Sequence, residues 1–292
     1  MKFKDDFHIY AIITIIFWSL AYVLTRLALI HFSAYSLGFL RYFVASCALI
    51  VIVIAVKIKP PKKSDLKWFA LTGATGFFLY IITFNKGCET VTASTSSIII
   101  ATVPVITALI AHFIYKERLK GIQWVATALS FSGVALLTMF NGIFTISNEL
   151  IWLLLAAVCL SLYNILQRKL TKTYSALQTS AFSIFGGTIM LSIFLPASVA
   201  EVKCAPAVPL LYVAILGVFS SAIAYVSWSK AFSLARNTSS VSNYMFVTPF
   251  LTTLLGFLLA GEIPDFLTIL SGVIILSGLL LFNFGGRLIT PP

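Results

Sequence analysis

Ten apolar stretches of about 20 residues each, separated by short polar breaks, dominate this chain and limit the folds open to it. A helix of about 20 apolar residues crosses the roughly 30 Å core of a bilayer. The stretches do not alternate apolar and polar residues, as membrane β-strands do. We therefore predict an all-α membrane protein with ten transmembrane helices. The expected spans are residues 8–30, 35–56, 66–87, 91–114, 121–140, 149–167, 177–197, 208–231, 239–260 and 265–285.

Composition and motifs argue against a catalytic role. Of the 292 residues, 60% are hydrophobic and 10% are charged, whereas soluble domains carry about 25% charged residues. What the spans leave over is too short for a soluble catalytic domain. The sequence has no metal-ligand spacing such as CxxC or HExxH, and its spans hold no paired carboxylates or histidine-assisted nucleophile. We expect no enzyme activity, no metal and no cofactor.

The formal net charge of +11 follows the expected membrane topology. With the amino terminus inside, sixteen of the twenty Lys and Arg residues fall in tails, loops and span ends of the inner face. Lys and Arg in short loops stay on the cytoplasmic side, so we expect a multi-pass protein of the plasma (inner) membrane with both termini in the cytoplasm. The expected partners are the lipid bilayer and a small-molecule substrate, with no nucleic acid.

Two segments share one layout at a constant offset: STSSIIIATVPVITALIAHFIYKE (94–117) and SSVSNYMFVTPFLTTLLGFLLAGE (239–262). Each half of the chain holds five spans, an odd number, so the second half must enter the membrane from the opposite side. We predict a first repeat over residues 1–145 and an inverted second repeat over residues 146–292. An offset of 145 pairs Ser97 with Ser242, Pro104 with Pro249 and Glu117 with Glu262, and an offset of 142 pairs Ser19 with Ser161 and Arg26 with Arg168.

An inverted pair of repeats is the architecture that many secondary transporters use for alternating access to the two sides of a membrane. A secondary transporter is therefore the predicted function. The alternative is a structural or receptor-like membrane protein that transports nothing, although an inverted duplication gives such a protein no evident advantage.

The five-plus-five layout, the segment FWSLAYVLTRLAL in the first span and the two Pro-to-Glu segments resemble the drug/metabolite transporter superfamily, specifically its EamA-type members. The resemblance covers nearly the whole chain. It implies two five-helix bundles around a central cavity and the export, or efflux, of small metabolites such as amino acids. All nine acidic residues lie in tails, loops or span ends, so the mid-membrane glutamate of the superfamily's small multidrug exporters is missing here.

Polar and aromatic residues at helical spacing indicate a central cavity, because positions three or four apart share a helix face. In the third span this spacing selects Leu79 and Thr83 among others. Any single residue is more simply explained by helix packing or an interfacial position, but together the residues favour a polar and aromatic substrate cavity. Its expected residues are Trp18, Tyr22, Arg41, Thr83, Ser97, Tyr163, Asn164, Tyr225, Trp228, Asn243 and Tyr244.

Proline and glycine add two expectations about the helices. Pro104 and Pro249 are expected to bend their spans, since proline removes a backbone hydrogen bond, and the bends could be moving hinges or fixed kinks. Gly133 and Gly278 permit close helix contacts. The sequence leaves open whether those contacts form within the protein or in a homodimer.

Overall fold

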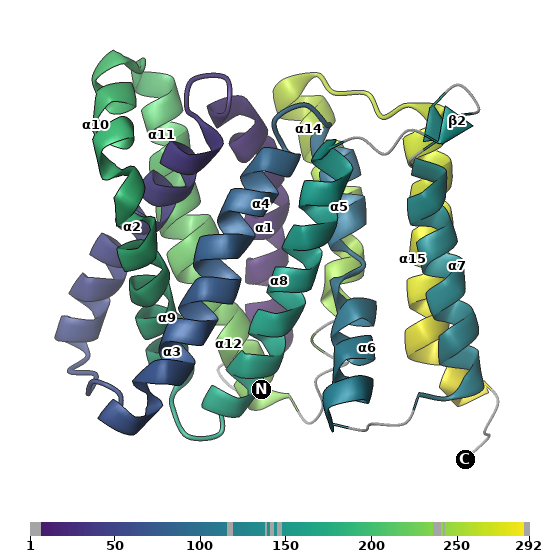
Figure 1. The fold of residues 1–292 in the computed structure, drawn as a ribbon, viewed down its shortest axis with the longest axis horizontal. Helices are drawn as coiled ribbons and strands as arrows, with labels where there is room; N and C mark the ends of the chain where they lie inside the picture. The colour runs from purple at the N-terminus through teal and green to yellow at the C-terminus, as the bar shows by residue number, and fades with distance from the viewer. Residues whose placement is uncertain are drawn as a thin grey trace.

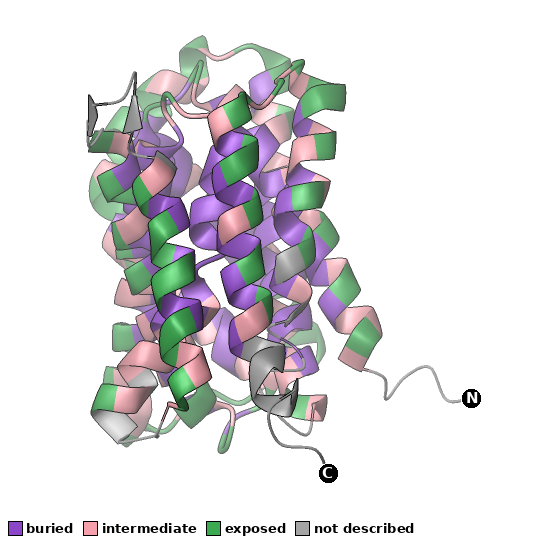
Figure 2. Cartoon of the chain, turned by 90° about the vertical axis from the view of Figure 1, so that its right-hand side faces the viewer, coloured by how far each residue is buried: buried purple, intermediate pink, exposed green. Residues whose placement is uncertain are grey.

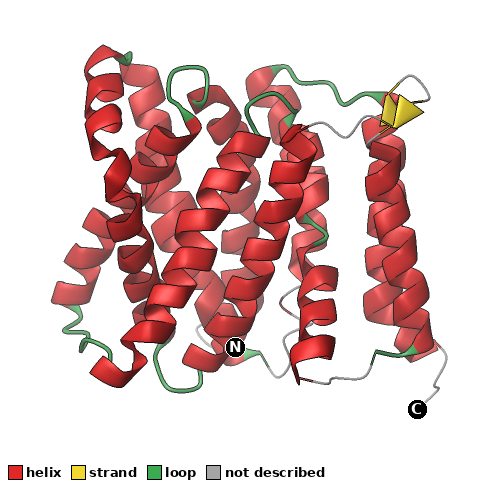
Figure 3. Cartoon of the chain, viewed as in Figure 1, coloured by secondary structure: helices red, strands yellow, loops and turns green. Residues whose placement is uncertain are grey.

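The computed structural model describes residues 7–115, 119–137, 139–140, 143–144, 148–235, 241 and 243–288. Seven helical segments are long and apolar enough to cross a membrane, and three shorter apolar helices bring the number among the described residues to ten. Outside the helices, these residues include only a short antiparallel pair, in which Met139 faces Phe144 (Figure 3). The predicted all-α membrane fold is confirmed.

The helices of the first half run from one end of the bundle to the other (Figure 1). They are α1 (Phe7–Ala28), α2 (Ala34–Ala55), η2 (Lys63–Asp65), α3 (Leu66–Gly73), η3 (Ala74–Leu79), α4 (Tyr80–Gly87), α5 (Ala93–Ile100), α6 (Val103–Tyr115) and α7 (Gly121–Leu137), followed by β1 (Met139–Phe140) and β2 (Ile143–Phe144). The third span is continuous through η2, α3, η3 and α4, and the fourth is broken between α5 and α6.

The second half repeats this order in the opposite direction. Its elements are α8 (Asn148–Leu170), α9 (Ala176–Leu191), η4 (Ser192–Phe194), α10 (Leu195–Cys204), α11 (Ala207–Ile215), η5 (Leu216–Ile223), α12 (Ala224–Leu234), η6 (Asn243–Val247), α14 (Thr248–Ala260) and α15 (Phe266–Leu288). The start of α1 and the end of α15 lie at one end of the bundle (Figure 1), here named the terminal end. The opposite end, where α4 ends and α5 begins, is named the distal end.

Matching local structure shows how closely the halves correspond. Ser33 accepts a hydrogen bond from the Ser36 backbone at the start of α2, and Ser175, 142 residues later, caps α9 in the same way. A serine at this position satisfies a free N–H of the first helical turn. The wide π-helical turns η3 and η5 also begin 142 residues apart, at 74 and 216. The two inverted five-helix repeats are therefore confirmed.

Both prolines lie where a broken span resumes. Pro104 is the second residue of α6, after a turn in which the Thr102 hydroxyl donates to the Ile99 carbonyl at 2.7 Å. Pro249 is the second residue of α14, which follows the tight helix η6. Because the first turn of a helix needs no N–H partner, proline fits there without losing a bond. The spans predicted as single helices over 91–114 and 239–260 are thus each divided.

Buried residues lie along the bundle axis and exposed residues cover its outside (Figure 2). Many exposed residues are large and apolar, such as Ile54 at 71% and Ile189 at 72% exposure. An apolar exterior suits a protein dissolved in lipid, with its backbone polar groups paired inside helices. The glycines at the close contacts are occupied within the chain: a Cβ on Gly133 would lie 3.0 Å from the Ser271 carbonyl oxygen on α15.

Candidate binding cavity

A cavity lies near the middle of the bundle, between the two repeats. It is bordered by α1, α2, α4, α5, α8, α12, η6 and α14. About 20 Å³ of it is open to the centre of a water molecule, room for one or two waters. The lining residues are Trp18, Ala21, Tyr22, Arg41, Tyr80, Phe84, Ser97, Ile100, Ala101, Leu160, Tyr225, Met245 and Thr248.

Aromatic rings form much of the cavity wall. The Trp18 ring lies edge-on to Tyr225, with centroids 5.3 Å apart, and Tyr22 meets Phe84 in the same manner at 5.3 Å. Tyr80 stacks on Phe84 at 5.5 Å. Edge-to-face and offset pairs at these separations are the favoured arrangements of aromatic side chains. The wall is therefore a connected set of rings, on which the apolar part of a small molecule could stack.

Arg41 is the only charged residue among the described residues that line the cavity. It lies seven residues inside α2, counted from Ala34, which is about 10 Å along the helix, and it is 3% exposed. Its Nε donates to the Ser221 hydroxyl at 2.7 Å. Ser221 lies in the wide turn η5, a distortion that often occurs at functional sites. The cavity thus carries one buried positive charge, held in place from the second repeat.

Five of the residues expected from the sequence line this cavity: Trp18, Tyr22, Arg41, Ser97 and Tyr225. Trp228 does not. It packs behind Trp18, with ring centroids 5.0 Å apart, and is 1% exposed. Thr83 is also directed elsewhere, because its hydroxyl donates to the Leu79 and Tyr80 carbonyls of its own helix, at 2.8 and 3.0 Å.

The other expected residues lie outside the cavity lining. Tyr163 is fully buried against Phe77, with centroids 5.1 Å apart. Asn164 is half-buried on α8, and Tyr244 bonds His8 near the terminal end. Asn243 begins η6, but its side chain is outside the described part of the chain. Helical spacing identified a face for each residue but not how deep in the bundle it lies.

Sequence reasoning missed Tyr80, Phe84, Met245 and Thr248. Tyr80 and Phe84 lie four residues apart on α4 and so share a face. The expected pair, Leu79 and Thr83, lies one position earlier in the same span. The wide turn η3 over residues 74–79 explains the shift, because a turn of i→i+5 bonds holds an extra residue and rotates everything after it. Leu79 is consequently 43% exposed on the outside of the bundle.

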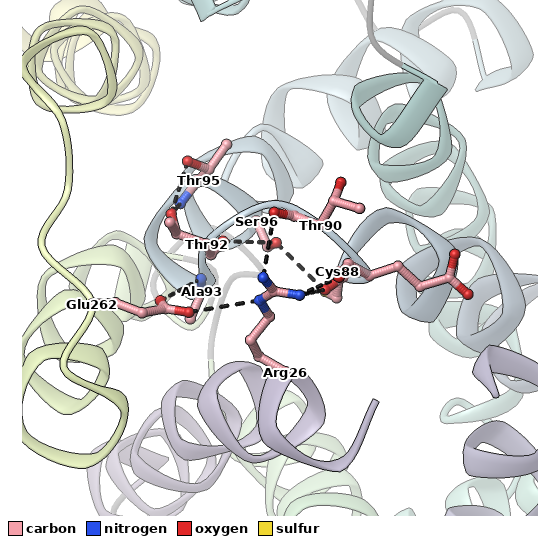
Figure 4. Close-up of polar contacts among 9 residues, drawn as sticks. Arg26, Cys88, Thr90, Thr92, Ala93, Thr95, Ser96 and Glu262 are labelled. Atoms are coloured by element: carbon pink, nitrogen blue, oxygen red, sulfur yellow. Dashed lines mark hydrogen bonds and ion pairs between the residues drawn. The ribbon is translucent and has the colours of Figure 1, made fainter. Parts of the chain in front are cut away.

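The distal end of the bundle is closed above the cavity by a polar cluster around Arg26 (Figure 4). Arg26 lies one helical turn beyond Tyr22 on α1. Its Nη1 donates to the carbonyls of Cys88, at 3.4 Å, and Glu89, and its Nη2 donates to the Thr90 carbonyl at 3.5 Å. One cation therefore binds three successive carbonyls where α4 ends, which satisfies groups that a helix end leaves unpaired.

Glu262 connects this cluster to the second repeat (Figure 4). It follows α14 and its left-handed cap residue, Gly261 at φ 64°. Glu262 Oε1 lies 3.8 Å from Arg26 Nε, and Oε2 accepts from the Ala93 backbone at 2.8 Å. Two charges and the start of α5 thus join the repeats across the distal end. We name Arg26, Glu262 and the carbonyls they hold the distal closure.

Cys88 lies directly inside the distal closure. It is 1% exposed, and its thiol donates to the Ser96 hydroxyl at 3.5 Å. Burial raises the pKa of the Cys88 thiol to about 12, because a thiolate would lose its hydration there. The thiol is therefore both covered and protonated while the closure is intact.

The terminal end is held by different contacts. The Tyr174 hydroxyl, between α8 and α9, donates to Asp65 Oδ2 at 2.5 Å and accepts from the Lys62 backbone at 3.2 Å. Deeper in the second repeat, Gln167 donates to Ser229, whose hydroxyl lies 2.7 Å from that of Ser180. No group of three or more His, Cys, Asp or Glu residues that could hold a metal ion is found in the described part of the chain.

Comparison with known proteins gives consistent matches over nearly the whole chain. The model of the EamA-like transporter family matches residues 7–139 and 147–284. The uncharacterized transporter YdfC of Bacillus subtilis is 30% identical, over 89% of this chain and 85% of its own length. A probable terminal-alkyne amino-acid exporter of Streptantibioticus cattleyicolor is also 30% identical, over 93% and 91%. A crystal structure of a protein 17% identical shares the fold, with a TM-score of 0.64 over 97% of this chain and 98% of that one.

Proposed function

Because this chain belongs to the EamA-like transporter family, we propose that it exports small metabolites, in the first place amino acids, by alternating access. As a member of that family it is a multi-pass membrane transporter of small molecules and not an enzyme, so the non-transporting alternative is set aside. The amino-acid substrate is supported by the similarity to a protein named as a probable amino-acid exporter. It is supported also by a cavity that combines aromatic rings with a cation and hydroxyl groups.

The observation that carries the proposal is a central cavity between inverted repeats, closed at the distal end by contacts between those repeats. Amino acids are too large for the space of about 20 Å³, so this arrangement represents an occluded state. The cavity must widen for a substrate to enter. Movement of one repeat against the other would open it, because inverted repeats can exchange their conformations.

The two broken spans are where such a movement would be easiest. α5 and α6 form one interrupted span on the first repeat (Figure 1), and η6 and α14 form its counterpart on the second. Both contribute to the cavity, through Ser97 and Ile100 on α5 and through Met245 and Thr248. A short backbone break absorbs a change of angle at less cost than a continuous helix. We therefore propose that Pro104 and Pro249 mark the bend points of the transport cycle.

Orientation follows from charge. The connection between α2 and α3 lies at the terminal end and carries Lys57, Lys59, Lys62 and Lys63. Short loops rich in lysine remain on the cytoplasmic side. We propose that the terminal end, with both termini, faces the cytoplasm of a cell whose plasma membrane holds the protein. The distal closure then faces the outside.

An untargeted comparison tests the function without assuming a substrate. Cells with and without the protein are grown alike, and the metabolites in their medium are compared. Two variants separate transport from indirect effects. Ala21→Trp fills the cavity that Ala21 lines, whereas Ile54→Trp changes a residue that is 71% exposed on the outside of the bundle. Both are first shown to be monodisperse after purification.

Export of one or more amino acids is expected from the wild type and from Ile54→Trp, and not from Ala21→Trp. The exported compounds are then loaded into proteoliposomes containing purified protein. If no amino acid or related metabolite crosses those membranes faster than in empty liposomes, the proposed substrate class is wrong.

A further inference from the structure

We propose that Arg41 is the anion-binding group of the cavity and selects substrates that carry a carboxylate. This inference rests on the proposed function, since it names the chemical feature by which the exported molecule is recognised. It starts from the burial of Arg41. A charged side chain within a membrane span is costly and usually has a functional role.

The position of Arg41 excludes the usual way of reducing that cost. Long cationic side chains near span ends extend their charge to the membrane surface, and Lys86 fits this pattern because it lies in the last turn of α4 and pairs with Glu89 at 2.8 Å. Arg41 is 3% exposed and lines the central cavity. Its charge is therefore directed into the protein.

No carboxylate of the described residues neutralises this charge. Their ion pairs are Arg26 with Glu262 and Lys86 with Glu89, both at the distal end. The hydrogen bond found for the Arg41 guanidinium in this part of the chain uses Nε alone. A guanidinium has five N–H donors in a planar fork that matches a carboxylate. The two Nη groups, with four donors, are left to face whatever the cavity holds.

A second polar group of the same cavity has no protein partner. The Thr248 hydroxyl is buried, at 5% exposure of the residue, and among the described residues nothing accepts from it or donates to it. Buried polar groups are nearly always paired, so an unpaired hydroxyl in a cavity wall points to a ligand. Thr248 begins α14, on the broken span of the second repeat, and Arg41 belongs to the first. Together they supply one cation and one hydroxyl from opposite repeats.

The remaining wall fixes the rest of the substrate class. Trp18, Tyr22 and Phe84 offer ring surfaces to an apolar group. No acidic residue lines the cavity in the described part of the chain, so a substrate with a net positive charge would be repelled by Arg41. The cavity fits a zwitterion or a monoanion with an apolar side chain, such as an aliphatic or aromatic amino acid, better than an amine or a basic amino acid.

Direct binding tests this inference without the leak that uncharged probes show across liposomes. L-leucine and L-phenylalanine, each with its amide, are titrated calorimetrically into the purified full-length protein. The amide keeps the side chain and the amine but lacks the carboxylate. We expect the wild type to bind each acid at least about 30-fold more tightly than its amide, the scale of losing one partner of a buried charge pair.

Variants then locate the preference. Arg41→Gln is expected to bring the acid-to-amide ratio to about one, and Arg41→Lys, which keeps the charge but not the planar fork, should retain part of it. Lys203→Gln removes an exposed charge at the end of α10 and should leave the ratio unchanged. A merely structural Arg41 would weaken acid and amide together, because both depend on the same folded cavity.

The inference is overturned if the wild type binds acids and amides alike, if Arg41→Gln keeps the preference, or if none of the four probes binds. The proposed function is judged separately by the untargeted export comparison, which assumes no substrate. Export of amines or of other uncharged metabolites in that comparison would leave the transporter function standing and remove the role given to Arg41.

Discussion

Replacing Arg26 with glutamine should open the distal end of the bundle. Arg26 pairs with Glu262 at 3.8 Å, with side chains that are 31% and 14% exposed, and it bonds carbonyls at the end of α4. A solvent-exposed ion pair contributes up to about 1 kcal/mol, and a hydrogen bond to a charged group about 1.5–3 kcal/mol. Because water replaces part of these contacts on opening, we take about 2 kcal/mol as the loss.

This loss predicts a measurable change in population. Every 1.4 kcal/mol changes an equilibrium constant about tenfold, so about 2 kcal/mol corresponds to roughly 30-fold. A distal-open state populated at about 1% would rise to about 20%. The change concerns only the closure, and the cavity walls are left as they are.

Cys88 is a native reporter of this opening, because it lies buried just inside the closure. A membrane-impermeant maleimide is added from outside to cells at pH 8, in a Cys204→Ser background that removes the exposed thiol at the distal end. Thiolates are the reacting species, and in the closed state burial holds the thiol pKa at about 12. Opening rehydrates the thiol and lowers its pKa, so labelling of Cys88 in Arg26→Gln should be about 20-fold faster.

Lys86→Gln is the matched control. Lys86 lies at the same end of the bundle and forms an ion pair at 2.8 Å, but its partner Glu89 belongs to the same repeat. Losing that pair releases no contact between repeats, so Cys88 labelling should stay near the wild-type rate. If Arg26→Gln labels no faster than Lys86→Gln, the Arg26 cluster is a surface contact and not a closure.

Three further predictions concern packing and unpaired hydroxyls. Gly278→Ala should destabilise the protein by about 1–3 kcal/mol, measured as a lower melting temperature, because its Cβ would lie 2.4 Å from Ser130 Oγ, whereas Gly121→Ala, with nothing within 4 Å, should not destabilise it. Thr248→Val should raise the melting temperature, since it removes a buried hydroxyl without a partner in the described structure, and should weaken amino-acid binding by about 5- to 10-fold. Tyr163→Phe should also raise the melting temperature but leave binding unchanged, because Tyr163 is outside the cavity lining.

The sequence was sufficient to predict the ten spans and their inverted duplication. Span length depends on bilayer thickness alone, and apolar composition encodes it directly. The duplication is preserved as matching residues at fixed offsets, and those offsets reappear in the structure as the paired caps at Ser33 and Ser175. Neither inference needed the packing of one helix against another.

The cavity was predicted less completely, for reasons visible in single residues. Helical phase was carried through the third span as though it were a uniform helix, and η3 rotated the true face by one position to Tyr80 and Phe84. Tyr163 faces the bundle interior as expected, but it is stopped by Phe77 before it reaches the cavity. Periodicity reports which way a side chain points, whereas depth and local winding depend on neighbours distant in sequence.

The inverted repeats give the distal closure a counterpart that sequence alone identifies. Offsets of 142 and 145 carry Arg26 to Arg168 and Glu262 to Glu117, at the opposite end of the bundle. Arg168 ends α8, and Glu117 lies outside the described residues and enters only through its place in the sequence. If the repeats exchange conformations during transport, the first pair closes the distal end in one state and the second pair closes the terminal end in the other. Arg168→Gln should then slow Cys88 labelling from outside, the reverse of Arg26→Gln, because weakening one closure shifts the population toward the state held by the other.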